Sequence, residues 1–360
     1  MEEELIREGM PAEEIQKLCD LHVTVFKDAL EENKPVEAPA GHPVHTMMAE
    51  NAEFSQIINE LDITMKKLVV NTSQDKVREL KSDFETIISK LAEIEKHYVR
   101  KENQLFPFLE KHGITGPSQV MWGIHDEIRQ LLKDFGNAVE DDNTASIIET
   151  GPKVSRNIVE MIYKENNILF PMALDTLSEE EWINIHKGEA EIGYAFVTPE
   201  AVWYSDAPAV KESIEISDES SADFKLDTGT LTLEQINLML THLPVEVSFV
   251  DENDAVRYYS DTPERTFPRS PGIIDRKVQN CHPPKSIHIV NRILEAFRDG
   301  SKDTADFRIQ MGGKTILIRY FAVRNHEGTY RGTLEVTQDI TEILDMKGEQ
   351  RLLDWDKDEK

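Results

Sequence analysis

Apolar residues recur every three to four positions through the first half of the chain, a spacing that predicts helices with one buried face. The pattern breaks at short stretches rich in Pro, Gly or Asn, which end one helix and begin the next. We expect the long helices at about residues 42–70, 75–112 and 153–176, with another beginning after Gly116-Pro117-Ser118. Helices joined by such short breaks predict an antiparallel bundle.

The later part of the chain follows a different pattern, in which apolar and polar residues alternate as they do in strands. The pair Gly312-Gly313 predicts a tight hairpin between two of these strands. Two strands, a helix and then three successive strands predict an α+β domain with an antiparallel sheet. We expect the strands at about residues 245–251, 256–260, 306–311, 314–324 and 329–339, and helices at 233–242 and 286–298.

These patterns predict a mainly α protein in five parts. The fourth part is the α+β domain, and an acidic linker precedes it, because Asp, Glu, Ser and Pro dominate there and no apolar period survives. We expect an N-terminal helical segment at residues 1–34, a four-helix bundle at 41–195, the linker at 196–229, the α+β domain at 230–345 and a charged tail at 346–360.

The acidic composition limits the partners that the protein can have. Asp and Glu number 68 against 40 Lys and Arg, so the formal net charge is -28. This charge repels nucleic acid and anionic membranes, and we expect neither as a partner. The two cysteines, Cys19 and Cys281, are too few for a disulfide framework. Because the chain also has no signal-peptide pattern and no apolar run of about 18 residues, we expect a cytoplasmic protein.

Two related stretches carry the candidate chemistry of the bundle. His97–Pro107 reads HYVRKENQLFP, and Met161–Pro171 reads MIYKENNILFP. When the two are aligned on Leu-Phe-Pro, Lys101 falls opposite Glu165. Two helices that carry ionisable residues at matching depth predict a bundle whose interior is lined with ligands.

Glu165 gives the sharpest indication of a site. It lies in the apolar stripe of its helix, where an unpaired carboxylate would be very costly, so we expect it to be paired or to bind a metal. Imidazole and carboxylate groups suit iron, and four helices can direct such groups at one axis. The candidate metal ligands are His97, Glu102, His125 and Glu165, with Glu50, His45, His42 and His22 near the N-terminal end.

Several segments together carry a family resemblance. They are CDLHVTVF, GHPVH, KHYVRKENQLFPFLEKHGITGP, MWGIHDEI, KENNILFPMALDTL, IIDRKVQNCHPPKS and IRYFAVRNHEGTYRGTLEVTQDIT. The chain resembles the hemerythrin-like, or HHE cation-binding, proteins, and in particular bacterial proteins that join such a bundle to a C-terminal PAS domain and carry a domain of unknown function. The resemblance implies a hemerythrin-like four-helix bundle with non-haem iron, expected as a di-iron pair, followed by a PAS domain.

Two positions depart from the pattern of that family. Met161 stands where a histidine of the fourth helix is usual, and Lys101 stands at the usual glutamate of the second helix, with Glu102 one step later. The set of ligands is therefore depleted. Two irons, one metal ion and no metal all stay open, and the N-terminal candidates would have to complete a di-iron set.

A sensor is our first functional hypothesis. The bundle would bind O2 or NO, or change redox state, at its iron, and the PAS domain would pass the change to an unidentified protein partner. We also expect a homodimer formed through the PAS domain, and an unidentified ligand in that domain is open. One alternative is a di-iron oxidase or an iron-centre repair protein. Another is a metal-free scaffold with a PAS dimerisation module. We assign no catalytic residue.

Overall fold

The computed structural model describes residues 37–199, 203, 224–262 and 265–348. The expected N-terminal helical segment, with His22, and most of the expected acidic linker lie outside the described residues. The chain forms two compact units. The first comprises Met1–Glu215 and Pro268–Asn291, and the second comprises Ile216–Phe267 and Arg292–Lys360.

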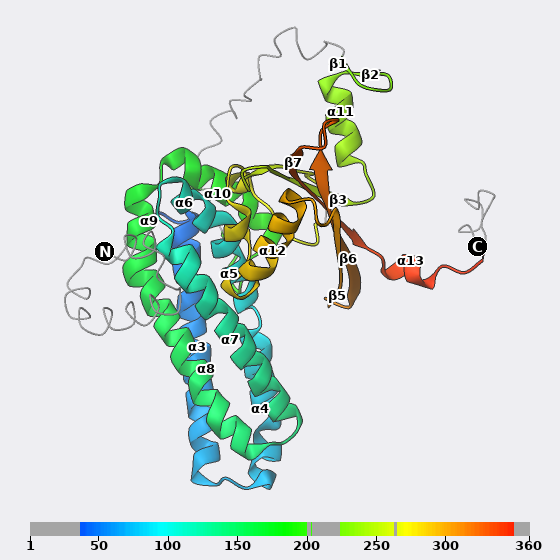
Figure 1. The fold of residues 1–360 in the computed structure, drawn as a ribbon. Helices are drawn as coiled ribbons and strands as arrows, with labels where there is room; N and C mark the ends of the chain where they lie inside the picture. The colour runs from blue at the N-terminus through cyan, green and yellow to red at the C-terminus, as the bar shows by residue number, and fades with distance from the viewer. Residues whose placement is uncertain (1–36, 200–202, 204–223, 263–264, 349–360) are drawn as a thin grey trace, which may run out of the picture. The chain divides into compact units, whose positions relative to one another are not determined.

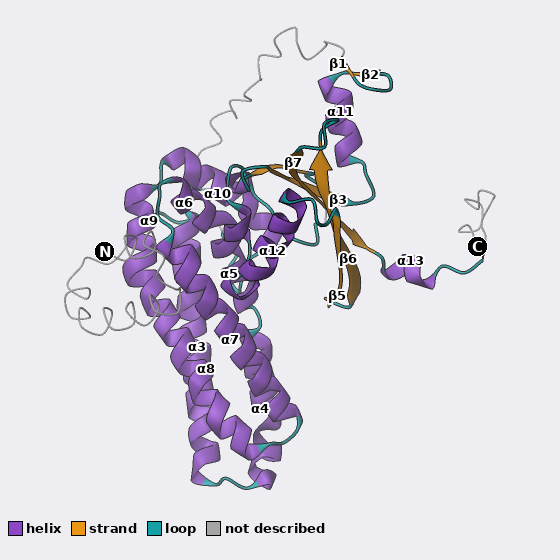
Figure 2. Cartoon of the chain, in the orientation of Figure 1, coloured by secondary structure: helices purple, strands orange, loops and turns teal. Residues whose placement is uncertain are grey.

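Four long helical rods form the body of the first unit (Figures 1 and 2). The helix α3 packs against α4 and α8, and α7 packs against the same two, so the four rods form a closed bundle. The expectation of a four-helix bundle is therefore confirmed. The long helices are α3 (Pro43–Val70), α4 (Gln74–Leu91), α7 (Gly116–Glu140) and α8 (Thr144–Lys164).

The second and fourth rods each contain one π turn. The second rod continues from α4 through α5 (Ile94–Arg100) into the first π turn, Lys101–Leu105, and then α6 (Phe106–Lys111). The fourth rod continues from α8 into the second π turn, Glu165–Leu169, and then α9 (Phe170–Thr176). Each π turn is followed by a Phe-Pro pair whose proline has no amide hydrogen to give. Such turns are rare and frequently mark functional sites.

The fourth rod begins earlier than its apolar pattern indicated. We expected its start at about residue 153, but α8 begins at Thr144. The side chain of Asn143 accepts a hydrogen bond from the Ser146 amide at 3.2 Å and caps the helix, and Pro152 lies inside it. Our expectation of a start at about residue 153 was wrong, because the Asn143 cap lies more than two turns earlier.

The helix α10 (Glu179–Ile192) follows the bundle and begins with a capping box. The Ser178 side chain accepts from the Glu181 amide, and the Glu181 side chain accepts from the Ser178 amide. Buried Trp182 and Ile185 hold α10 against the hydrophobic core.

Residues 268–291, which we call the belt segment, belong to the first unit although they lie far along the chain. They form three short 3-10 turns, Pro271–Ile273, Val278–Cys281 and Pro284–Ser286. The first packs against α6, α10 and the first π turn, and the last packs against α7. The belt segment therefore lies directly over one of the two π turns.

The second unit is an antiparallel sheet of five strands in the order β4-β3-β7-β6-β5. The predicted hairpin at Gly312-Gly313 joins β5 to β6, with Met311 opposite Lys314. The expected α+β domain is confirmed. Its elements are β1 (Phe224–Lys225), β2 (Thr230–Leu231), α11 (Leu233–Thr241), β3 (Glu246–Asp251), β4 (Val256–Tyr259), α12 (Ile287–Arg298), β5 (Thr304–Met311), β6 (Lys314–Arg324), β7 (Tyr330–Asp339) and α13 (Thr341–Asp345).

In the part of the chain that the structure describes, no helix combines the length and the apolar character that crossing a bilayer requires.

Candidate functional site: a buried charge cluster

The two π turns bring Lys101 and Glu165 together in the middle of the bundle. Both residues are essentially fully buried, with 0% and 1% of their surface exposed, and the Lys101 ammonium donates to Glu165 Oε1. The ammonium also lies 2.9 Å from His125 Nε2 and 4.3 Å from the centre of the Tyr98 ring. A lysine has three N–H donors, and here each has an acceptor: a carboxylate, an imidazole nitrogen and an aromatic face.

A carboxylate fixes the tautomer of His125. Its Nδ1 lies 2.7 Å from Glu102 Oε1, so the proton belongs on Nδ1, and the lone pair of Nε2 accepts from Lys101. Burial lowers the pKa of His125 well below its usual value, and the nearby cations Lys101 and Arg129 lower it further. The ring is therefore neutral, as this pattern of donors requires.

His97 has carboxylates on both sides. Its Nδ1 lies 2.7 Å from Glu50 Oε2, and its Nε2 lies 3.1 Å from Glu165 Oε2. Both ring nitrogens of His97 therefore have carboxylate partners. The Asn51 side chain donates to the same Glu165 oxygen at 2.7 Å.

Two arginines hold the outer carboxylates. Arg100 donates to Glu50 and, at 3.1 Å, to Glu189. Arg129 donates to both oxygens of Glu102, at 2.9 and 3.0 Å, in the two-pronged geometry that fits a carboxylate. In each histidine–carboxylate pair, the carboxylate thus also accepts from an arginine guanidinium.

The cluster gathers acidic and basic groups in contact with one another. Its four buried carboxyl groups lie against three basic side chains, Arg100, Lys101 and Arg129, and burial raises the pKa of Glu102 to about 7. We call this set the buried charge cluster. Its members are Glu50, Asn51, His97, Arg100, Lys101, Glu102, His125, Arg129, Glu165 and Glu189.

The pairing keeps Glu165 ionised in a fully buried position. Burial alone raises the pKa of this carboxyl, but the charges of Lys101 and His97 and their hydrogen bonds more than offset it, and the pKa is lowered to about 2. Burial lowers the pKa of Lys101, although Glu165 opposes this effect. The two groups therefore depend on each other for their charge.

The structure brings five of the eight candidate ligands together. His97, Glu102, His125, Glu165 and Glu50 all belong to the buried charge cluster. His42 and His45 lie outside the cluster, and His22 is not among the described residues.

His42 is buried but makes other contacts: it caps α3 through Val44 and lies between the rings of Trp182 and Trp203, at 4.6 and 4.5 Å. Burial, together with His186 and His45, lowers its pKa to about 4. His45 points to solvent, as its position opposite the apolar stripe of α3 dictates. His22 lies outside the described residues. Neither His42 nor His45 completes a ligand set with the cluster.

The sequence reasoning missed the cations of the cluster, Arg100, Lys101 and Arg129, and also Asn51 and Glu189. A signal for Lys101 was present, because Ile94, Tyr98, Lys101 and Leu105 follow the spacing of one buried helical face. The repeat also placed Lys101 opposite Glu165, the residue to which it is bound. Lys101 was interpreted as the loss of a metal ligand, whereas the structure shows it as the partner of Glu165.

The cluster as arranged does not fit a di-iron centre. Lys101 lies between the His125 and Glu165 atoms that an iron would need, and cations engage both oxygens of Glu102. Among the described residues, no group of three or more His, Cys, Asp or Glu side chains is arranged to hold a metal ion. The donors are of the right chemical kind, but the lysine and the arginines already satisfy them.

The outer side of the first π turn is bound by the belt segment. Arg276 donates to the Glu102 carbonyl at 3.3 Å, and the Ser270 hydroxyl donates to the Asn103 carbonyl at 2.6 Å. These are the carbonyls that lie five and four residues before Pro107, which has no amide hydrogen to offer them. The belt segment supplies the missing donors.

Further contacts fix the belt segment to α6. Arg276 also donates to both oxygens of Glu110, each at 2.7 Å, and Asn280 donates to the same carboxylate at 3.2 Å. At Gly272, an added Cβ would lie only 2.8 Å from the Phe108 ring and 3.1 Å from Pro107. The close fit shows that the belt segment and the π turn pack as one piece.

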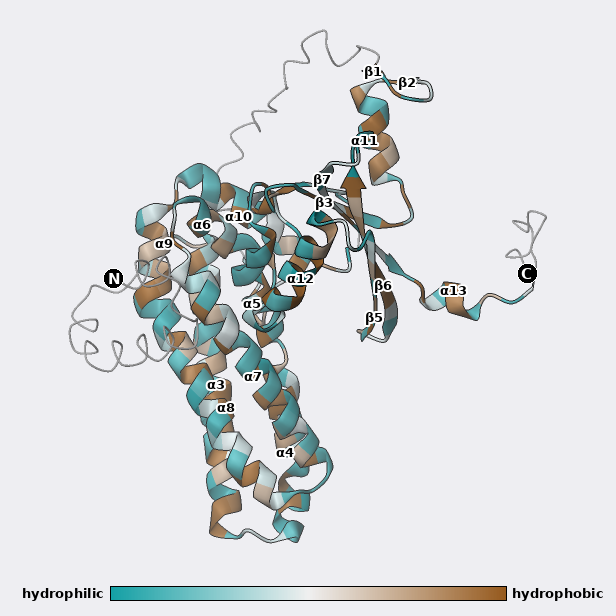
Figure 3. Ribbon diagram, in the orientation of Figure 1, coloured by the Kyte–Doolittle hydropathy of each residue, from teal (hydrophilic) through white to brown (hydrophobic). Residues whose placement is uncertain are grey.

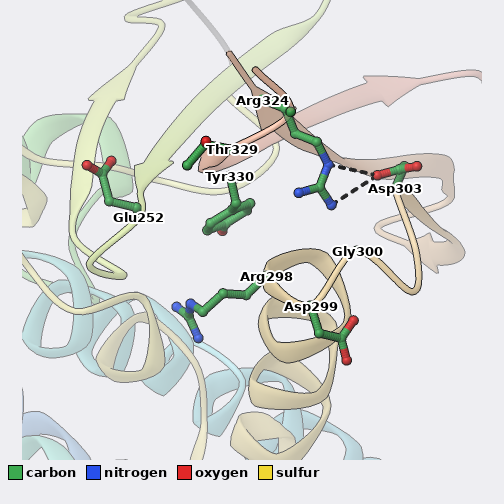
Figure 4. A pocket seen from close by; sticks show the side chains of 9 residues that line it. Glu252, Arg298, Asp299, Gly300, Asp303, Arg324, Thr329 and Tyr330 are labelled. Atoms are coloured by element: carbon green, nitrogen blue, oxygen red, sulfur yellow. Dashed lines mark hydrogen bonds and ion pairs between the residues drawn. The ribbon is translucent and has the colours of Figure 1, made fainter. Parts of the chain in front are cut away.

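The second unit has a surface pocket of about 600 Å³ at the end of α12. Its two arginines already have acidic partners. Arg298 binds Asp254 at 2.6 Å. Arg324 binds Asp303 at 3.1 Å, as Figure 4 shows. Because these charges are paired, the pocket offers no free cation to a ligand.

Family models match three parts of the chain. The hemerythrin HHE cation binding domain matches residues 42–173, and a PAS domain matches residues 236–341. A family of unknown function matches residues 1–32. No curated protein matches the chain.

Solved structures add relatives for part of the chain. A C-terminal domain from Streptococcus mutans is 35% identical, with 36% of this chain and 99% of that chain covered and a TM-score of 0.34. A PAS domain from Colwellia psychrerythraea is 17% identical, with 31% and 98% covered and a TM-score of 0.24. A sensory box sensor histidine kinase from Vibrio cholerae is 10% identical, with 29% and 89% covered and a TM-score of 0.24. The chain thus combines a region that matches the hemerythrin HHE cation binding domain with a C-terminal region that matches a PAS domain, the organisation that its sequence resembles.

Proposed function

We propose that the protein is a signal-transducing sensor in which the state of the buried charge cluster is passed to the belt segment. The combination of a hemerythrin-like domain with a PAS domain supports a sensory role. In this proposal, a change in the charge or pairing of the cluster shifts the first π turn, and the belt segment responds. We further propose that the protein acts in the cytoplasm through a protein partner, which its acidic surface and its two cysteines support.

The observation that carries the proposal is the double role of Glu102. Its carboxylate lies inside the cluster, bound to His125 and Arg129, while its carbonyl oxygen accepts from Arg276 of the belt segment. The belt segment lies within the residues that match the PAS domain, yet it packs with the bundle. A movement of Glu102 would therefore change contacts both in the buried charge cluster and in the belt segment.

A double-mutant cycle tests the connection. We would measure unfolding free energies for Glu165→Gln, Arg276→Ala and the double variant. Distant, independent sites add to within about 0.5 kcal/mol, so a larger coupling energy is expected here because both residues bind the first π turn. In the control cycle, Lys285→Ala is used in place of Arg276→Ala. Lys285 is an exposed residue of the belt segment that pairs with Asp126. Additive energies in both cycles would contradict the proposal.

Iron sensing is the second candidate function. The gathering of His97, His125 and Glu165 at one level of the bundle favours it, because two imidazoles and a carboxylate are a common set of iron ligands. In this form of the proposal, O2, NO or a redox change acts at the iron. The protein would be purified without a metal-binding tag, its iron content measured, and its absorption spectrum recorded reduced, in air and with azide. Bound iron whose spectrum responds to air or azide supports this candidate, and absence of iron after anaerobic reconstitution rejects it.

We also propose that the protein forms a homodimer through its PAS domain. In the second unit, α11 has no buried residue, and its side chains Leu233, Leu238 and Met239 are largely exposed. Figure 3 shows brown, hydrophobic residues along this helix. A second copy of the chain would cover this surface.

A further inference from the structure

We infer that the Lys101 ammonium occupies the position of a metal ion in this bundle, so that the wild-type chain closes a latent metal site that removal of the lysine opens. The inference does not depend on the proposed signalling role, and it is an alternative to iron sensing by the wild-type chain. It rests on the arrangement of the groups around the ammonium.

The surroundings of Lys101 have the form of a metal site with its supporting groups. Histidines that bind metals usually donate their second nitrogen to a carboxylate, which fixes the tautomer and orients the ring. Here Glu102 binds His125 Nδ1 at 2.7 Å, and Glu50 binds His97 Nδ1 at 2.7 Å. The Nε2 atoms of both rings are thereby directed at the Lys101–Glu165 pair.

Glu165 lies between Lys101 and His97. One of its oxygens accepts from the Lys101 ammonium and the other lies 3.1 Å from His97 Nε2. Two imidazole nitrogens and one carboxylate are the set that binds non-haem iron and related divalent ions with open positions. Two members of that set, His125 and Glu165, bind the Lys101 ammonium. The third member, His97, binds the Glu165 carboxylate.

The lysine and a metal ion exclude each other. The ammonium fills the space beside the His125 lone pair, at 2.9 Å from Nε2, and a bound ion would lie at about 2.0–2.2 Å from the same atom. A divalent ion next to a buried ammonium would also suffer strong repulsion. Removing the amine therefore leaves a carboxylate and two oriented imidazoles that lack their cation.

The test compares metal binding by the wild type, Lys101→Ala and Lys101→Glu, with Co²⁺ as the probe. Equilibrium dialysis followed by elemental analysis gives the bound metal, and the visible absorption of Co²⁺ reports its ligands. We expect about one Co²⁺ per chain in each variant and none above background in the wild type. Adding His125→Ala to Lys101→Ala should abolish binding. The matched control is Lys96→Ala, which removes a lysine of the same helix that pairs with Glu93 at the surface.

The outcomes decide the inference even if a variant is unstable. Either variant can be refolded with and without Co²⁺, because a metal that completes a site also stabilises the fold. Folding that requires Co²⁺ supports the inference. Binding of Co²⁺ by the wild type to the same extent, binding that survives His125→Ala, or failure of both variants to bind or to fold with Co²⁺ would overturn it.

Discussion

Lys101 is the residue on which the buried charge cluster depends, because it is the cation nearest the centre. It pairs with Glu165 and satisfies the lone pair of His125. Replacing a whole buried ion pair by apolar groups is often tolerated, whereas removing one partner leaves an uncompensated charge. Each charged member of the cluster is therefore stable in its buried position only while its partners are present.

Lys101→Met should destabilise the protein by about 3–5 kcal/mol, because it leaves Glu165 buried without its main partner. Adding Glu165→Gln should recover a large part of this loss, since the uncompensated charge is then gone. Denaturant unfolding of the four proteins measures the coupling. If the losses of the two single variants simply add in the double variant, the pair does not act as a unit.

The acid stability of the protein should depend on Glu165. Its pKa is about 2 in the folded chain against 4.5 for the free group, so the stabilisation is fully present above pH 4.5 and is lost as the pH falls toward 2. This amounts to about 3 kcal/mol. The difference in unfolding free energy between the wild type and Glu165→Gln should shrink over this range. Parallel pH profiles for the two proteins would show that Glu165 is not held ionised.

The sequence allowed the acidic half of the site to be predicted but not its basic half. Glu165 stood out because a carboxylate in an apolar stripe needs a partner, and the structure supplies one. The spacing also places Lys101 on a buried face, but a long flexible lysine side chain usually extends its ammonium to water, so spacing alone does not show that the ammonium is buried. Which cation meets which carboxylate depends on contacts between helices far apart in sequence.

At the scale of elements, the first π turn makes two sets of contacts, one through its side chains and one through its backbone carbonyls. Its side chains Lys101 and Glu102 enter the cluster, while its carbonyls at Glu102 and Asn103 accept from the belt segment. Pro107 makes the second function possible, because it withholds the amide hydrogen that would otherwise compete for those carbonyls.

Pro107→Ala should loosen the belt segment. The new amide hydrogen can donate to the Glu102 or Asn103 carbonyl in competition with Arg276 and Ser270. We expect faster hydrogen exchange of the belt amides, measured by mass spectrometry. Pro171→Ala, in the equivalent place after the second π turn, is the matched control and should leave the belt unchanged. Equal effects of the two substitutions would mean that Pro107 acts only through helix stability.

Most elements could be predicted because their apolar periods are long and regular, as in α3 and the hairpin of β5 and β6. The π turns could not, since one extra residue in a turn leaves the apolar spacing nearly intact. The packing of the belt segment on the bundle was equally hidden, because it joins residues such as Arg276 and Glu110 that are far apart in the chain. Propensity and pattern carry no information on such long-range pairs.

For the whole molecule, dimerisation through the PAS domain gives a direct prediction. Leu238→Asp places a charge on the exposed apolar surface of α11 and should shift the protein from dimer toward monomer in sedimentation experiments. Asn237→Asp adds the same charge at an exposed polar position of the same helix and should have little effect. A dimer that withstands Leu238→Asp would place the interface elsewhere.

The central claim is that the belt segment responds to the state of the buried charge cluster, and hydrogen exchange of residues 268–291 tests it most directly. The wild type would be compared with Lys101→Met and with the surface control Lys96→Met. We expect Lys101→Met to speed exchange in the belt segment by more than the general loss of stability, which the amides of α4 report. Faster exchange confined to the bundle, with the belt segment changing no more than α4, would contradict the account.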